Sequence, residues 1–268
     1  MNKFFIGVAG HKPYKMPQYD IYTPIQVGAS GRPTIDGFLR DDVGDNISDL
    51  NANFSELTGL YYIWKNVNSE YKGLVHYRRY LGNKNYKLIK PVEEKFDSII
   101  KYNDLKLLFD NNDVILPKKR NYYVETNYSH YIHAHSPEAL RYVKNIISES
   151  CPEYLNSYNK VMDSRSAHMF NMFIMKSNLF DEYCKWLFSI LFKLREKIDI
   201  SRYSGQEVRV FGYVSELLLD VWLNKNEISF AEVPVVYVEG QHLFRKGINL
   251  LKRKIFRHGN SHIKSSID

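Results

Sequence analysis

The chain has 268 residues, which is long enough to bury a sizeable core in one large domain or two small ones. Its hydrophobic fraction of 44% and charged fraction of 25% are typical of a globular protein, and its two cysteines exclude a disulfide framework and fit a reducing cytoplasm. The net charge of +7 is concentrated in residues 241–268, where seven Lys and Arg face one acid, so the near-neutral remainder argues against a nucleic-acid-binding face.

Segments with strand patterns alternate along the chain with segments of helical periodicity. Apolar runs predict strands at residues 4–9, 71–77, 113–117, 170–175 and 230–238, the last interrupted by Pro234. Helices are predicted at residues 54–66, 101–111, 137–148, 177–195 and 211–223. Residues 14–50 are rich in Gly and Pro and predict a long functional loop. The alternation predicts an α/β sheet with mostly parallel strands, which binds ligands beyond the carboxyl ends of its strands.

The sequence His76-Tyr77-Arg78-Arg79-Tyr80 lies at the end of the predicted strand 71–77, and Arg78 and Arg79 follow that strand directly. Guanidinium groups suit bidentate contact with phosphate, and a diphosphate leaving group needs its developing charge neutralised. The alternative is a surface cluster of ion pairs. On the first interpretation, the two arginines form an anion site at the end of a strand.

A second candidate site is the stretch Asp41-Asp42-Val43-Gly44-Asp45-Asn46. Three carboxylates in five positions suit Mg²⁺ or Mn²⁺, or the hydroxyls of a ribose. The spacing is not that of a calcium loop. A solvated turn with a helix cap is the alternative.

A third candidate is Glu216, which lies early in the predicted helix 211–223, with Arg209 just before that helix. A carboxylate there could act as the general base for an acceptor hydroxyl. The alternative is a structural acid paired with Arg209. Asp163 and His168 precede the predicted strand 170–175 and are further candidates, as is Asn171 within it.

Three histidines, His130, His133 and His135, lie near Glu125. Their spacing, without cysteine, does not match the usual zinc patterns. The sequence also contains no Gly-rich phosphate loop, no serine nucleophile elbow and no CxxC pair.

Six motifs occur together in a fixed order: DDVGDNIS, ELTGLYYIWKN, YKGLVHYRRYL, NYYVETNYSHYIHAH, NMFIMKSNLFDEYCKWLF and RVFGYVSELLLDVWL. In combination they resemble a family of bacterial capsule, O-antigen and exopolysaccharide glycosyltransferases, long catalogued as a domain of unknown function. Some members are assigned as galactofuranosyltransferases. The resemblance covers about residues 3–238. It implies a GT-A-like fold with a single Rossmann-type domain, here residues 1–240, and a UDP-sugar donor.

Enzymes with the GT-A fold commonly hold a divalent metal on the donor diphosphate with an Asp-x-Asp motif at the end of a central strand. The equivalent strand here ends in HYRR and carries no carboxylate. We therefore expect fixed positive charge from His76, Arg78 and Arg79 to replace the metal. A metal held by Asp41, Asp42 and Asp45 is the alternative.

The resemblance also suggests roles for the other candidates. His11 and Lys12 would hold the nucleotide, Asp42, Asp45 and Asn46 would contact ribose or base, and Arg209 would lie on the donor side. Asp163, His168 and Asn171 would lie on the acceptor side. An inverting enzyme would use Glu216 as its base, whereas a retaining enzyme needs none.

The basic segment 241–268 predicts a membrane contact. Phe244, Ile248, Leu251 and Ile255 recur at helical spacing, and a basic amphipathic helix binds anionic lipid. A solvated tail is the alternative. On the first interpretation, we expect the acceptor to be a lipid-linked glycan. We also expect the protein to be cytoplasmic and peripheral on the inner face of the membrane. A non-catalytic nucleotide- or carbohydrate-binding protein of the same fold is the alternative function.

Overall fold

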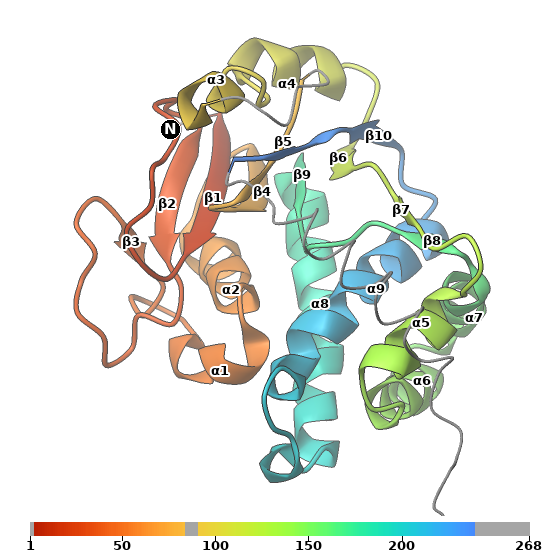
Figure 1. The fold of residues 1–268 in the computed structure, drawn as a ribbon. Coiled ribbons are helices and arrows are strands. Elements are labelled where there is room, and N and C mark those ends of the chain that lie inside the picture. Colours follow the sequence, from red (N-terminus) through yellow and green to blue (C-terminus); the bar gives the residue numbers. More distant parts are fainter. Residues whose placement is uncertain (1–2, 84–90, 239–268) are drawn as a thin grey trace, which may run out of the picture.

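A central sheet organises the protein in the computed structural model, which describes residues 3–83 and 91–238. Its main strands are β1 (Phe4–Gly10), β2 (Tyr22–Gln26), β3 (Leu39–Arg40), β4 (Tyr71–His76), β6 (Val114–Pro117), β9 (Phe173–Lys176) and β10 (Phe230–Val233). They lie in the order β10-β6-β9-β4-β1-β2-β3, as Figure 1 shows. Four short strands complete the set: β5 (Arg79–Leu81), β11 (Val235–Tyr237), β7 (Arg120–Asn121) and β8 (Ser166–Ala167).

The sheet is mostly parallel, as predicted. β1 pairs in parallel with β2 and β4, and β6 pairs in parallel with β10, whereas β9 is antiparallel to both of its neighbours. Pro234 separates β10 from β11, because proline cannot donate a ladder hydrogen bond. β10 therefore pairs with β6, and β11 crosses to pair with β5.

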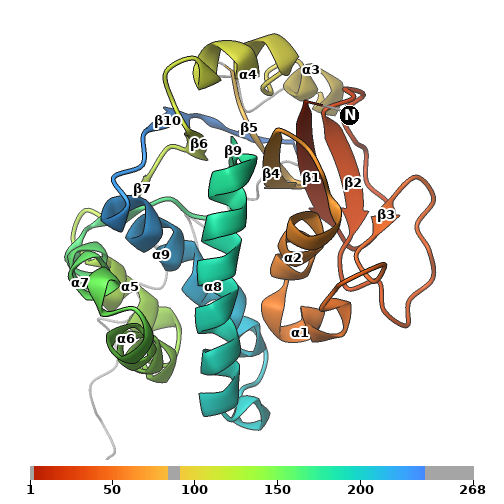
Figure 2. The same ribbon diagram turned by 180° about the vertical axis from the view of Figure 1, so that it is seen from behind.

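Helices cover both faces of the sheet (Figures 1 and 2). They are α1 (Asn51–Phe54), α2 (Leu57–Asn66), α3 (Val92–Phe96), α4 (Tyr102–Phe109), α5 (Asn127–Ala134), α6 (Glu138–Ser150), α7 (Leu155–Asp163), α8 (Ser177–Lys197) and α9 (Val210–Lys225). Four single 3₁₀ turns are η1 (Ser48–Leu50), η2 (Pro152–Tyr154), η3 (Ile200–Arg202) and η4 (Glu207–Arg209).

Two apolar cores lie on the two sides of the sheet, because successive side chains of a strand point to opposite faces. Ile6 and Val8 of β1 belong to the core under α3 and α4. Ala9 belongs to the larger core, which α2 and α6 to α9 cover. Helix α9 is buried almost all round and packs against α1, α7 and α8, so the side chains it carries are held firmly.

Most predicted elements are confirmed, three predicted segments differ in detail, and the helices α3, α5 and α7 were not predicted. The predicted loop 14–50 contains β2, which forms by pairing with β1. The predicted helix 54–66 is broken into α1 and α2 at Ser55, whose φ is 55°. The predicted strand 170–175 begins only at Phe173, because Phe170 and Asn171 adopt positive φ values of 81° and 50°.

The predicted amphipathic tail, residues 241–268, lies outside the described residues. Within residues 3–83 and 91–238, no helix has the length and apolar character needed to cross a bilayer.

Candidate functional site

The carboxyl ends of β1 and β4 lie side by side, because Ala9 is the register partner of His76. The residues that follow each strand therefore meet. Tyr14 and Tyr77 stack with ring centroids 3.6 Å apart, and His11 lies edge-on to both rings. The Arg78 guanidinium lies 4.8 Å from the Tyr77 ring centroid. We call His11, Tyr14, Tyr77 and Arg78 the aromatic platform.

Positive charge surrounds the aromatic platform. Burial lowers the pKa of His11, and the charges of Lys12, Arg78, Arg32 and Arg209 lower it further. These four cations come from the ends of β1 and β4, from the loop after β2 and from η4. The structure thus brings His11, Lys12 and Arg209, which were predicted to bind the donor, close to Arg78, which was predicted to stabilise the leaving diphosphate.

A second group lies beside the aromatic platform and centres on two carboxylates, Glu56 and Glu216. Burial raises the pKa of Glu216 to about 8, and the neighbouring Glu56 charge contributes to the rise. A backbone hydrogen bond from Phe170 and the charges of Arg79 and Arg209 act in the opposite direction. A carboxyl group with a pKa near neutrality is suited to general acid–base chemistry. We call Glu56, Glu216, His76 and Arg79 the carboxylate cluster.

The turn at Phe170 connects this cluster to the sheet. The Phe170 carbonyl accepts a hydrogen bond of 2.5 Å from His76 Nε2, and its ring lies 4.4 Å from the Arg79 guanidinium. Burial lowers the pKa of His76, the Glu56 charge raises it, and the Arg79 charge lowers it. His76 therefore holds the turn by donating this hydrogen bond to the Phe170 carbonyl. The Arg79 guanidinium packs on the Phe170 ring, and its charge acts on Glu216.

Asn171 holds the same turn from the other side. Its amide donates to Glu56 Oε1 at 2.6 Å and to the Gly212 carbonyl at 3.1 Å, and its Oδ1 accepts from Ser215 Oγ at 2.9 Å. Only 2% of Asn171 is exposed, so it acts as a positioning residue between Glu56 and α9. Asparagine also tolerates the left-handed backbone required here.

Arg209 links the aromatic platform to the carboxylate cluster. Its Nε donates to Ser55 Oγ at 2.8 Å, and its guanidinium lies 3.8 Å from a Glu56 oxygen. Half of its side chain is exposed, which leaves it accessible to a ligand. Arg78 and Arg79 are adjacent in sequence but diverge, with Arg78 over the platform and Arg79 over Phe170. The two guanidinium groups thus lie near different rings, and their joint contact with one diphosphate stays a prediction.

The predicted acidic loop is occupied by its own contacts. Asp41 is fully buried and accepts hydrogen bonds from the backbone N–H groups of Gly28 and Ala29 and from Ser48 Oγ. Asp42 pairs with Arg40, and Asp45 accepts from Tyr61 Oη. The Asn46 amide donates to the Gly44 carbonyl, and its oxygen accepts from the Ser48 N–H. The loop is thus braced internally, and the buried Asp41 carboxylate is occupied by these contacts.

Two acceptor-side candidates lie outside the carboxylate cluster. His168 is buried, with Nδ1 bonded to Asp220 at 2.5 Å and Nε2 to Glu232 at 2.9 Å. Both ring nitrogens are occupied, so His168 is a positioning residue that joins α9 to β10. Asp163 is exposed at the end of α7.

The described residues contain no group of three or more His, Cys, Asp or Glu side chains arranged to hold a metal ion. His130 and His133 both bond to the Glu125 carboxylate instead, and His135 stacks on Tyr213. Asp41, Asp42 and Asp45 are not gathered at one point either.

Sequence reasoning missed Glu56, Tyr14 and Tyr77. Tyr77 lies inside the HYRR motif, and its position at a strand end was available from the sequence. Glu56 lies in the first turn of the predicted helix 54–66, where an acidic residue is ordinary.

Comparisons with known proteins agree with the observed fold. The model of a family described as "Domain of unknown function (DUF4422)" matches residues 5–227. The apo structure of the bifunctional glycosyltransferase WbbM aligns with a TM-score of 0.80 and 29% identity over 89% of this chain. The chain spans 46% of that protein, about half its length. This similarity confirms the predicted GT-A-like fold. A comparison with curated proteins gives no match.

Proposed function

Because the chain belongs to the DUF4422 family, and its fold is that of a glycosyltransferase, we propose that it transfers a sugar from a nucleotide-diphosphate donor to a glycan acceptor. We further propose a UDP-hexose as the donor, with UDP-galactofuranose the first candidate. The proposed acceptor is a lipid-linked oligosaccharide in the synthesis of a bacterial surface polysaccharide such as capsule, O-antigen or exopolysaccharide.

The observation that carries the proposal is the juxtaposition of an electropositive aromatic surface with a carboxyl group of raised pKa. The stacked rings of Tyr14 and Tyr77 offer a flat face to a nucleobase. Lys12, Arg78 and Arg209 offer charge-assisted hydrogen bonds to a diphosphate. This combination lies beyond the carboxyl ends of parallel strands, where α/β folds bind nucleotides.

We propose an inverting reaction at these groups. The acceptor hydroxyl gives its proton to the Glu216 carboxylate while its oxygen bonds to the anomeric carbon of the donor. The bond from that carbon to the diphosphate oxygen breaks, and the nucleoside diphosphate leaves with the electron pair. Arg78 and Arg209 would stabilise the departing charge. The product anomer is inverted, which NMR of the product would check.

The fold implies a divalent metal on the diphosphate, but the residues present do not fit one. The end of β4 carries His76, Arg78 and Arg79, which repel a cation when charged, and the carboxylates of the acidic loop are committed elsewhere. We therefore propose that fixed cations take the place of the metal. Turnover should persist in EDTA.

The decisive experiment screens UDP-sugars for binding, slow hydrolysis and transfer, with and without EDTA. We expect at least one donor to be hydrolysed by the wild type, and a loss of about 100-fold in kcat for Arg78→Ala or Arg209→Ala, the two cations proposed to stabilise the departing charge. Arg141→Ala, an exposed arginine on α6, is the matched control and should retain full activity. Binding of UDP without hydrolysis or transfer would identify a non-catalytic binding protein.

Membrane attachment through residues 241–268 is a separate part of the proposal. Co-sedimentation with liposomes that contain anionic lipid compares the full chain with a chain ending at residue 240. Equal binding by both would contradict a lipid-binding tail.

A further inference from the structure

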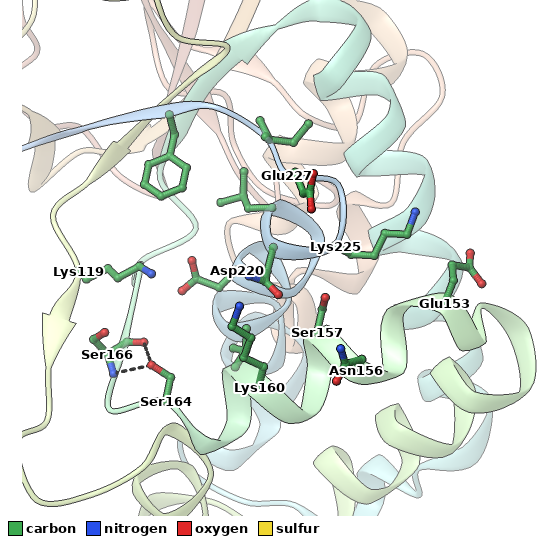
Figure 3. Close-up of a pocket in the computed structure, with 15 residues that line it drawn as sticks. Lys119, Glu153, Asn156, Ser157, Lys160, Ser164, Ser166, Asp220, Lys225 and Glu227 are labelled. Atoms are coloured by element: carbon green, nitrogen blue, oxygen red, sulfur yellow. Dashed lines mark hydrogen bonds between the residues drawn. The ribbon is translucent and has the colours of Figure 1, made fainter.

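A pocket of about 750 Å³ opens outside the carboxylate cluster (Figure 3). Its walls are α7, the C-terminal half of α9 and the beginning of β10. This volume lies in the upper half of the range of about 300–1,000 Å³ that is usual for small-molecule sites. It is therefore large enough for more than one sugar unit.

The lining of the pocket is polar and its charges balance. Three lysines accompany three acids: Lys119, Lys160, Lys225, Glu153, Asp220 and Glu227. Balanced charge disfavours a phosphate or another strong anion. Sugar hydroxyls both donate and accept hydrogen bonds, so they match a mixed set of ammonium, carboxylate, amide and hydroxyl groups.

The arrangement of the polar groups supports the same ligand. In the view of Figure 3, the Asp220 carboxylate lies between the ends of the Lys119 and Lys160 side chains, while Glu153 and Glu227 lie toward the margin. Asn156 and Ser157 add an amide and a hydroxyl from α7.

One wall of the pocket is apolar. Phe230 lines the pocket and is 37% exposed. An exposed ring provides a flat apolar surface, against which the C–H face of a sugar packs.

The pocket is coupled to the carboxylate cluster by two elements. On α9, Asp220 follows Glu216 by four residues, so the two side chains lie on the same side of the helix, about 6 Å apart along its axis. The segment 164–171 begins at the pocket with Ser164 and Ser166 and ends at Phe170 and Asn171, which hydrogen-bond to His76 and Glu56 of the cluster. Between them, His168 fixes Asp220 through both its backbone N–H and its ring.

We propose that this pocket binds the non-reacting part of a neutral, polyhydroxylated acceptor saccharide, which places the acceptor next to Glu216. The proposal deepens the proposed function and rests on it for the identity of the ligand as an acceptor. The saccharide-binding site itself is testable without any transfer reaction.

The test presents the full chain to an array of neutral oligosaccharides of two to six hexose units, their acidic counterparts and inorganic phosphate. We expect retention on neutral glycans. Calorimetry on the best neutral binder should then give a Kd at least tenfold weaker for Lys160→Ala and for Asn156→Ala. Both positions are exposed, so both variants should fold. Lys144→Ala, an exposed lysine on α6, is the matched control and should bind like the wild type.

The outcomes separate the pocket from the donor site. Failure to bind any neutral glycan, binding of acidic glycans or phosphate only, or full affinity in both pocket variants would overturn the proposal. UDP binding is measured on the same proteins and should be unchanged by either pocket substitution. Glycan binding that depends on the pocket, together with absent UDP binding, would sustain the saccharide site and refute the transferase.

Discussion

The raised pKa of Glu216 predicts that this residue makes the protein less stable as the pH rises. Its pKa is about 8 in the folded protein against an ordinary value of 4.5. Below pH 4.5 the carboxyl is protonated in both states, and no penalty exists. Between pH 4.5 and 8 the unfolded chain releases the proton and the folded chain retains it, so the free energy of unfolding falls. At about 1.4 kcal/mol per pH unit, the loss reaches at most about 5 kcal/mol.

The substitution Glu216→Gln removes this penalty while it keeps a neutral side chain of the same shape. Relative to the wild type, the variant should gain stability progressively from pH 5 to pH 8, by a few kcal/mol at the upper end. Urea titrations at four pH values measure the difference. Glu182→Gln, at an exposed position on α8, is the control and should change stability by less than about 0.5 kcal/mol at each pH. A Glu216→Gln variant that matches the wild type at pH 8, or is less stable, would refute the reasoning.

Asp41→Ala should lower the free energy of unfolding by about 3 kcal/mol in urea titration, because two backbone N–H groups lose a buried acceptor. Asp42→Ala, which breaks only a partly exposed ion pair, should cost about 1 kcal/mol. Asn171→Ala should lower the free energy of unfolding by about 2 kcal/mol, as measured by thermal unfolding. An unchanged midpoint temperature would contradict its role in holding the left-handed turn. The rate of sugar transfer should rise with pH up to about 8 as Glu216 loses its proton, and a flat profile between pH 6 and 9 would rule it out as the base.

The sequence predicted the elements that have strong local patterns. The apolar runs of β1 and β4 and the helical periodicity of α8 and α9 are visible without the fold. β2 was not predicted, because its sequence YTPIQ is short, contains Pro24 and lies in a turn-rich stretch. It becomes a strand only through its pairing with β1.

The candidate site was partly predictable for the same reason. The predicted strand 71–77 ends within the HYRR motif. The sequence therefore places His76, Arg78 and Arg79 at the carboxyl end of a strand. The contact between Asn171 and Glu56 spans 115 residues and depends on two local departures from regular structure, at Ser55 and Phe170. No periodicity encodes such a contact. The raised pKa of Glu216 also arises from this assembly and from no feature of α9 alone.

At Pro234 the chain crosses from the neighbour of β6 to the neighbour of β5. This crossing joins the turn that carries Arg78 and Arg79 to β11, the last described strand. β11 pairs with β5 so that Tyr237 is the register partner of Arg79, and the Val238 N–H donates to the Arg78 carbonyl at 3.1 Å. The backbone that carries both arginines is thus held by a strand formed more than 150 residues later. Fraying of that late strand would release the two guanidinium groups from their positions together, so the amides of β5 and β11 should exchange with solvent as one cooperative unit.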